Sequence, residues 1–460
     1  MKLLNKIKYY VLGIICTMTA TGCEEFLDQR ISHSSKVASS LSDLQALLDA
    51  ENFINLGGYP FLLEVGTDDY QMDHNSLGNL TAFDQSTYKF IWTDLYPPVY
   101  LGVWVNSYKP ISISNIVMES LEKMGQTESA AGRNIRGQAL FHRAFGHFML
   151  AQVFCLPYDK DGTNAGLGIP LRHSSDANIN SQRSTIKETY DDILKDMNEA
   201  VVLLNETNGY LSRPNTASAY AALSRIYLAM ELYDESERAA TACLARQNTL
   251  IDLNTIDLGA NYPYNAMNVE TIFFACGSGS SLLSPSRGSV VSTELYNLFE
   301  PGDLRLQSYF RSEGDNGYSF KGNYMGFGSG TIFSGLTTSE VLLNRAECYA
   351  RGRESAKARA DLNRLLINRI DKASFKPVDE DDTDVLLKLI LDERRKELIN
   401  RSIRWLDLRR LNKDERFKKT IVRTLVDQGV SKEYKLLPNS ESYVFKIPKD
   451  VIDITGMHQN

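Results

Sequence analysis

Apolar residues recur at steps of three and four positions over much of the chain, which is the pattern of amphipathic helices. The pattern predicts a short helix over 41–53, a helical period from Trp104 to Met124 with a kink or late start near Ile111, and longer helices over 134–154 and 186–204. Proline inside a helix removes a backbone hydrogen bond, so Pro110 indicates a kink or a late helix start. The first half of the chain is therefore expected to be mostly helical.

Two later segments each predict a pair of antiparallel helices joined by a short break. The first pair covers 216–245 and the second covers 340–370. In both, a small residue, Ser224 or Ala346, stands three positions before a tyrosine. This rhythm resembles the tetratricopeptide repeat, in which each hairpin buries its apolar face by stacking on its neighbours. An ordinary helical bundle would give the same periodicity and stays open as the alternative.

Two regions break this periodicity and are rich in glycine, proline, serine and aromatic residues. They cover 54–103 and 248–335, and only short strands such as 271–275 are expected within them. Loops of this length are uncommon as plain connectors and tend to carry function. We therefore predict a helical scaffold over about 104–247 and 336–412, from which the two irregular regions project as insertions.

The stretch from Leu387 to Arg410 combines one apolar helical stripe with charged residues at the positions between. The pairs spaced for contact along the helix are Asp392 with Lys396, Arg394 with Glu397, and Glu397 with Arg401. Such a density of charge around Trp405 predicts a partly buried ionic network, with a solvated helix face as the alternative. Trp405 and Trp104 both fall in helical periods and are assigned to the core.

The same stretch carries a resemblance to a known family. Glu393-Arg394-Arg-x-Glu397-Leu398, followed by Arg404-Trp405-x-Asp407-Leu408-x-Arg410, resembles the C-terminal signature of the SusD/RagB family. Members of this family are outer-membrane nutrient-binding lipoproteins of Bacteroidota. The resemblance implies a mostly α fold, namely a tetratricopeptide-like superhelix of helical hairpins with loop-rich insertions and a few short strands. It also implies a partner, a SusC-type TonB-dependent outer-membrane transporter.

The first residues have the features of a secretory signal. Lysines precede a short apolar run, and small residues lead up to Cys23. The apolar run is too short to span a bilayer. The sequence Ala20-Thr-Gly-Cys23 resembles a lipobox, and the acidic residues behind it resemble the surface-export signal of Bacteroidota lipoproteins; a soluble acidic linker is the alternative. We therefore expect removal of residues 1–22, acylation of Cys23, and a lipid-anchored protein exposed at the cell surface on the outer membrane.

Composition and motifs exclude several classes of function. The chain has 460 residues with a net charge of −7 and no basic block, which argues against nucleic acid as a partner. Apart from Cys16 and Cys23, its cysteines are widely spaced, so we expect neither a metal nor a cofactor. Cys243 and Cys348 lie within apolar helical stripes, so we expect them to be buried free thiols. Motifs of serine hydrolases, phosphate-binding loops, zinc proteases and dinucleotide folds are absent from the sequence. A binding protein, not an enzyme, is predicted.

Sugar rings present flat C–H faces edged by hydroxyl groups, so their sites need an exposed aromatic ring beside Asp, Asn or Arg. A held aromatic ring loses little conformational freedom, which favours it as a contact surface. The candidate ligand-binding residues are Trp92, Tyr96, Tyr70, Asp68 and Asp69 from the first insertion, and Tyr318 and Tyr324 from the second. Packing within the loops is the alternative for each aromatic residue.

Together these features predict one SusD-like domain over 23–460. The resemblance implies that it binds a glycan or oligosaccharide and delivers it to the SusC-type transporter for import, without bond cleavage. Capture of a peptide is the first alternative, because some RagB-type relatives serve peptide uptake. A surface glycoside hydrolase is the second, because a pair of catalytic carboxylates has no local motif that the sequence could reveal.

Overall fold

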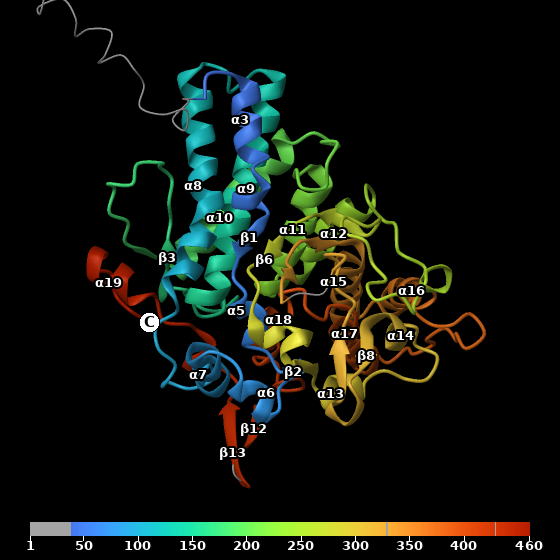
Figure 1. The fold of residues 1–460 in the computed structure, drawn as a ribbon. Helices are drawn as coiled ribbons and strands as arrows, with labels where there is room; N and C mark the ends of the chain where they lie inside the picture. Colours follow the sequence, from blue (N-terminus) through green and yellow to red (C-terminus); the bar gives the residue numbers. More distant parts are fainter. Residues whose placement is uncertain (1–37, 328–329, 428) are drawn as a thin grey trace, which may run out of the picture.

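The computed structural model describes residues 38–327, 330–427 and 429–460. The predicted leader and Cys23 lie outside the described residues. Paired α-helices dominate the fold and stack side by side (Figure 1). The helices of this stack are α8 (Leu101–Lys123), α9 (Ala130–Phe154), α10 (Ile186–Leu203), α11 (Thr216–Ala229), α12 (Tyr233–Leu244), α15 (Thr338–Arg351), α16 (Ser355–Leu366), α17 (Thr383–Glu397) and α18 (Arg404–Leu411).

The predicted mostly helical class and both predicted hairpins are confirmed. The hairpins are α11–α12 and α15–α16, and α12 packs against α15 so that the two pairs form one stack. The stack continues from α8 through α9 to α10 on one side, and from α15 to α17 on the other. One core cluster of buried apolar residues extends along it, from Tyr59 to Met457. Among the described residues, no helix has the length and apolar character needed to cross a membrane.

Local sequence signals account for several helix starts. Thr185 begins α10 with a capping box, in which its hydroxyl accepts from the Glu188 N–H and the Glu188 carboxylate accepts from the Thr185 N–H. Asn215 caps α11 in the same way. Inside the hairpin α11–α12, Ala222 and Ala240 are fully buried, because their small side chains let the two helices approach closely.

The helix around Pro110 differs from the prediction. α8 begins at Leu101, and Pro110 lies inside it without ending it. The proline ring packs against the backbone at Gly58, where an added Cβ would lie 3.1 Å from the Pro110 Cγ. Burial against neighbouring elements thus outweighs the lost backbone hydrogen bond. The predicted helix over 41–53 is likewise divided into two.

The first insertion and the segment before it consist of short elements. They are α3 (Leu41–Leu48), α4 (Glu51–Ile54), β1 (Leu56–Tyr59), α5 (Leu62–Val65), β2 (Tyr70–Gln71), α6 (His74–Gly78) and α7 (Ala82–Phe90). The loop between α9 and α10 contains β3 (Leu167–Pro170) and β4 (Arg183–Thr185), which pair antiparallel.

The second insertion is built of short strands and helical turns. They are η1 (Leu253–Thr255), β5 (Thr271–Phe273), β6 (Cys276–Gly277), η2 (Ser281–Leu283), η3 (Pro285–Arg287), β7 (Val290–Val291), α13 (Thr293–Tyr296), α14 (Arg305–Tyr309), β8 (Phe310–Ser312), η4 (Gly314–Asn316), β9 (Tyr318–Phe320), β10 (Ile332–Phe333) and β11 (Leu336–Thr337). Two pairings join the insertions: β1 pairs with β6, and β2 pairs antiparallel with β7, with Tyr70 opposite Val291. The two irregular regions therefore form one surface.

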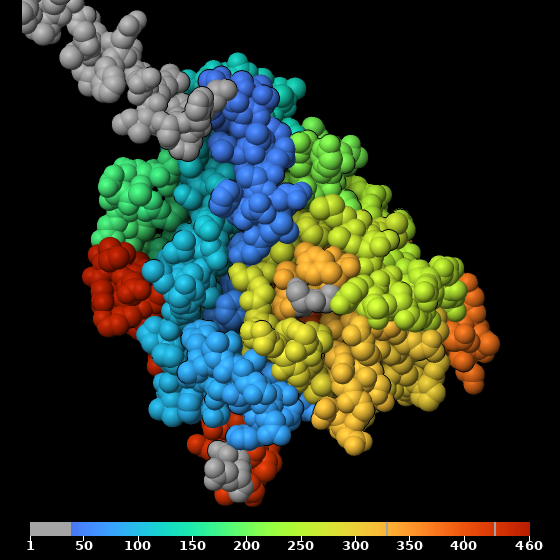
Figure 2. Space-filling view, in the orientation of Figure 1, coloured from blue at the N-terminus to red at the C-terminus, as the bar shows by residue number. Residues whose placement is uncertain are grey.

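The C-terminal part adds a long hairpin and a last helix. Strands β12 (Ile421–Asp427) and β13 (Val430–Leu436) pair antiparallel from Ile421 opposite Leu436 to Asp427 opposite Val430. The hairpin projects at the end of the molecule opposite α3 (Figure 1). After η5 (Glu441–Tyr443), the helix α19 (Lys449–Thr455) lies beside the loop that precedes β4, as Figure 2 shows.

The predicted ionic network around α17 is present, but its pairs differ from the prediction. Trp405 is fully buried, as predicted. Glu397 accepts hydrogen bonds from Arg369 at 2.7 and 2.9 Å and from Arg305 at 3.2 Å, so its partners lie on other elements and not on its own helix. Arg394 pairs with Asp407 across to α18, and Asp392 pairs with Lys388. The charges face neighbouring elements because α17 is buried on most sides.

The described cysteines are buried and free, which confirms the prediction for Cys243 and Cys348. Burial raises the pKa of the Cys155, Cys243 and Cys348 thiols to about 12.

Candidate functional site

A cavity of about 580 Å³ lies where both insertions meet the β12–β13 hairpin. Its lining residues come from five segments, namely 68 and 70–73, 88 and 92, 288–294, 315–316 and 419–424. We call it the hairpin cavity. Strand β2 of the first insertion pairs with β7 of the second, so the parts of the lining that come from the two insertions are connected by backbone hydrogen bonds.

The floor of the hairpin cavity is an aromatic cage around one arginine. The Arg423 guanidinium lies 3.9 Å from the ring centre of Tyr88, 4.3 Å from that of Trp92 and 5.1 Å from that of Tyr70. It also donates to the carbonyl oxygen of Tyr88 at 2.6 Å. The indole N–H of Trp92 donates to the carbonyl oxygen of Gly66 at 2.6 Å. Cation–π contacts of this kind strengthen when water is excluded, so they link Arg423 of β12 to the three rings of the first insertion.

One wall is a charged cluster around Asp68. Its carboxylate accepts from Arg404 at 2.8 and 2.9 Å, from Arg395 at 3.1 Å and from Lys419 at 2.8 Å. Burial would raise the pKa of Asp68, but Arg404 and Arg395 hold it well below its usual range. Glu294, at the exposed edge, pairs with both Arg395 and Lys419. The C-terminal signature thus supports this wall of the cavity through Arg395 and Arg404.

The structure brings three of the candidate ligand-binding residues, Asp68, Tyr70 and Trp92, to the hairpin cavity. We expected the aromatic candidates to expose their rings. This expectation is wrong for most of them, because their rings are packed inside the protein. The buried ones are Tyr70, Trp92, Tyr96 and Tyr324. That any candidate contacts a ligand stays a prediction.

The remaining candidates lie away from the cavity lining. Asp69 is buried and accepts from Arg395 at 2.9 Å. Tyr96 packs edge-on against Phe445, and Tyr324 lies under the Arg401 guanidinium with its hydroxyl donating to Glu270 at 2.9 Å. Tyr318 is half-buried and stacks on Tyr296, with ring centres 3.9 Å apart. Tyr318 lies two positions after the rim residue Asn316 in sequence.

Sequence reasoning missed Arg423, Tyr88 and Lys419. One signal was present for Arg423: Ile421, Arg423 and Leu425 alternate along β12, so they share one face, and all three are buried. A charged residue on an otherwise apolar strand face indicates a buried partner.

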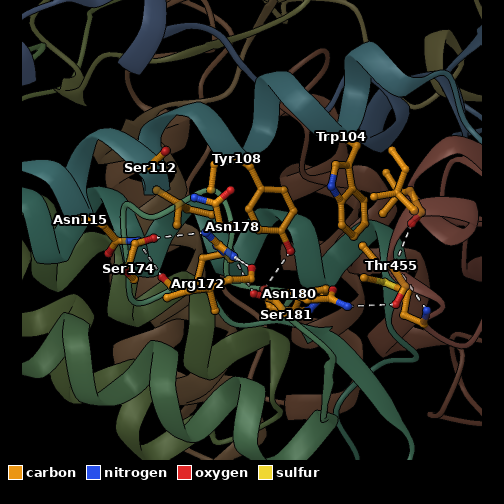
Figure 3. A pocket seen from close by; sticks show the side chains of 17 residues that line it. Trp104, Tyr108, Ser112, Asn115, Arg172, Ser174, Asn178, Asn180, Ser181 and Thr455 are labelled. Carbon is orange, nitrogen blue, oxygen red and sulfur yellow. Dashed lines mark hydrogen bonds between the residues drawn. The ribbon is translucent and has the colours of Figure 1, made fainter.

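A second cavity, of about 410 Å³, lies between α8, residues 170–181 and α19 (Figure 3). We call it the α8 cavity. Trp104 and Tyr108 point into it from one face of α8, with ring centres 4.9 Å apart. The assignment of Trp104 to the core is confirmed, since it is 9% exposed, yet its ring also lines this cavity.

Comparison with protein families decides the identity of the fold. A family model described as "Starch-binding associating with outer membrane" matches residues 25–228, and a model described as "SusD family" matches residues 336–458. The chain belongs to the SusD family. The two matches cover most of the helical stack of this SusD-family protein and leave α12 and the second insertion between them.

Solved structures of SusD relatives share this fold. A putative sugar binding protein from Bacteroides vulgatus is 21% identical, with a TM-score of 0.73 over 92% of this chain and 99% of that one. A SusD superfamily protein from Bacteroides thetaiotaomicron is 21% identical, with a TM-score of 0.69 over 92% of this chain and 100% of that one. A SusD-like carbohydrate binding protein from Bacteroides vulgatus is 18% identical, with a TM-score of 0.66 over 91% and 96%. The search of curated proteins gives no match.

Proposed function

We propose that this protein binds a glycan or its oligosaccharides at the cell surface and delivers them to a SusC-type TonB-dependent transporter, without cleaving them. Family membership carries the proposal, because the matching model describes starch binding in association with the outer membrane. The names of two structural neighbours, a sugar binding and a carbohydrate binding protein, point in the same direction.

We assign ligand binding to the hairpin cavity. Its volume of about 580 Å³ falls in the range of about 300–1,000 Å³ typical of small-ligand sites. Exposed polar residues ring its opening, and they can exchange hydrogen bonds with sugar hydroxyl groups. These are Gln71, Asp73, Thr293, Asp315 and Asn316. Trp92, Tyr70 and Asp68 form the interior. Tyr318, half-buried near the rim, is proposed to extend the ligand surface, and the buried Asp69, Tyr96 and Tyr324 are proposed to support it from behind.

The proposed organisation of the chain follows the family. Residues 1–22 would be the leader, Cys23 would carry the lipid, and 23–460 would form one SusD-like unit. The scaffold ranges 104–247 and 336–412 would present the insertions 54–103 and 248–335 to the ligand. The β2–β7 pairing, which joins the two insertions, supports this division.

The binding proposal is tested by titration calorimetry of the purified protein against a panel of glycans and a pool of peptides. We expect heat with a glycan. Asn316→Ala should lower its affinity by about two- to tenfold, because a lost hydrogen bond corresponds to about 0.5–1.5 kcal/mol. Trp92→Ala should lower it further by opening the floor.

The matched control is Asn297→Ala, an exposed asparagine of the same insertion outside both cavities, which should leave affinity unchanged. Heat with peptides alone would favour the peptide alternative. Shortened products after incubation with a glycan would favour the hydrolase. Unchanged glycan affinity in Trp92→Ala would refute the site while leaving the function in place.

A further inference from the structure

The α8 cavity has rigid walls from three parts of the chain. α8 forms one side, and the loop from Pro170 to Ser181 forms the second. The third side is α19, tied to that loop because Asn180 and Gln182 both donate to the carbonyl oxygen of Thr455 at 3.3 Å. The space-filling view shows the C-terminal segment against this loop (Figure 2). The cavity lies apart from the hairpin cavity and shares no lining residue with it.

The floor of the α8 cavity is aromatic and held in place. Trp104 and Tyr108 are four residues apart and so lie on the same face of the helix. The Tyr108 hydroxyl donates to the carbonyl oxygen of Pro170 at 2.9 Å, and the Trp104 indole packs edge-on against Phe154. Fixed rings bind a ligand at little entropic cost.

The rim carries neutral polar groups with unused hydrogen-bonding capacity. The side-chain amides of Asn178 and Asn180 each donate one hydrogen bond through the nitrogen, to Asp176 and to Thr455. Within the described part of the chain, their side-chain oxygens accept none. Ser112 is exposed and belongs to the same lining. These groups suit a ligand that offers several hydroxyl groups.

Charge distinguishes this cavity from the hairpin cavity. Its lining contains no Asp, Glu or Lys and a single arginine, whereas Asp68, Glu294 and Lys419 line the other. The Arg172 guanidinium is directed into its own loop, donating to the Ser181 hydroxyl at 2.9 Å and the Asp176 carbonyl at 2.6 Å. It therefore shapes the wall, and the cavity favours an uncharged ligand.

From these features we propose that the α8 cavity is a second saccharide-binding site, which takes a neutral sugar ring against Trp104 and Tyr108 with its hydroxyl groups on Ser112, Asn178 and Asn180. The proposal rests on the proposed function, since it takes the ligand to be a glycan. It adds that one protein molecule holds a glycan at two separate places, which raises avidity for a polymer without new contacts at the first site.

The test uses the full chain labelled with 5-fluorotryptophan, whose fluorine spectrum reports on each of its 3 tryptophans. Neutral oligosaccharides of glucose, mannose, xylose and galactose are titrated separately, and Trp104→Phe assigns its signal. We expect one of them to shift the Trp104 signal in a saturable way. Asn180→Ala should raise the sugar concentration needed for half-saturation about tenfold. Ala177→Phe, at an exposed lining position, should abolish the shift by filling the cavity.

Asn316→Ala, in the hairpin cavity, should leave the Trp104 titration unchanged, and Asn297→Ala serves as the control outside both cavities. Calorimetry could instead show a single binding site, with affinity lowered by Asn316→Ala but not by Asn180→Ala or Ala177→Phe. That result would overturn the second site and leave the proposed function intact. Absence of binding by every glycan in both measurements would overturn both. A Trp104 shift with decanoate but with no sugar would also overturn the saccharide site, in favour of an acyl chain between Ile179 and Ile454.

Discussion

His142 is a buried titratable side chain without a hydrogen-bond partner. It lies in α9 with its ring against Phe141 and Phe273, and both ring nitrogens lack a partner among the described residues. Burial lowers its pKa from 6.5 to about 3. The unfolded chain therefore binds a proton below about pH 6.5 that the folded chain does not bind. Stability should fall as the pH drops from about 6.5 towards 4, by up to about 1.4 kcal/mol per pH unit.

His142→Leu should consequently stabilise the protein by about 1 kcal/mol near pH 7, since an unpaired buried polar group is replaced by an apolar one. It should also reduce the dependence of stability on pH between about 4.5 and 6.5 by the share that His142 contributes. Urea unfolding at several pH values measures both effects. His458→Leu, at an exposed histidine, is the control and should keep the wild-type slope. An equal slope in His142→Leu would contradict the assignment.

Helix α17 depends on ion pairs that reach other parts of the chain. Glu397→Gln keeps the shape of the side chain but leaves Arg305 and Arg369 with less compensating charge in a buried site. We expect a loss of about 3–5 kcal/mol in the free energy of unfolding, measured with denaturant. Asp392→Asn, which breaks the exposed pair with Lys388 on the same helix, should cost less than about 1 kcal/mol. If both substitutions lowered the free energy of unfolding by the same amount, the buried network would contribute no more stability than an exposed ion pair.

These pairs also show what periodicity can predict. Spacing of three or four residues reports contacts along one helix, and it correctly indicated the buried stripe, the helical hairpins and the core position of Trp405. It cannot report the partners of Glu397, which lie 28 and 92 residues away. For the same reason the ring of Trp92 was identified as a candidate but its contact with Arg423 was not. Long-range packing decides whether such a ring faces a ligand or the interior.

The β12–β13 hairpin is held to the first insertion by Arg423. Arg423→Met keeps much of the apolar stem but removes the charge from the cage of Tyr70, Tyr88 and Trp92. We expect local opening of the hairpin to become easier by about 2 kcal/mol, which is more than tenfold in amide exchange over 421–436. Hydrogen–deuterium exchange measures this. Val422→Ala, on the exposed face of the same strand, is the control, and faster exchange throughout the helical stack would instead indicate global destabilisation.

The whole molecule consists of a helical frame and two insertions that share one surface. The fold class and the family followed from the sequence because both depend on local periodicity and a short signature. The position of the hairpin cavity did not follow from the sequence. It depends on the pairing of Tyr70 with Val291 and on the packing of the β12–β13 hairpin beside both insertions. The α8 cavity was missed for a similar reason: Trp104 has the period of a core residue, and only the loop and α19 create a space beside it.

Attachment to the membrane gives the last prediction, which concerns the whole protein in its cell. The resemblance of residues 20–23 to a lipobox predicts a lipid anchor at Cys23, outside the described residues. Cys23→Ser should abolish labelling by radioactive palmitate and move the protein out of the outer-membrane fraction of a Bacteroidota host, because several acyl chains on one residue hold a protein far more firmly than one. Replacing Glu24 and Glu25 with alanine should preserve lipid labelling but reduce digestion by protease added to intact cells, since only the export signal is lost. If palmitate labelling and membrane association persisted in Cys23→Ser, the predicted anchor would be refuted. If protease digested the double alanine variant at the cell surface as it digests the wild type, the acidic residues would be a soluble linker and not an export signal.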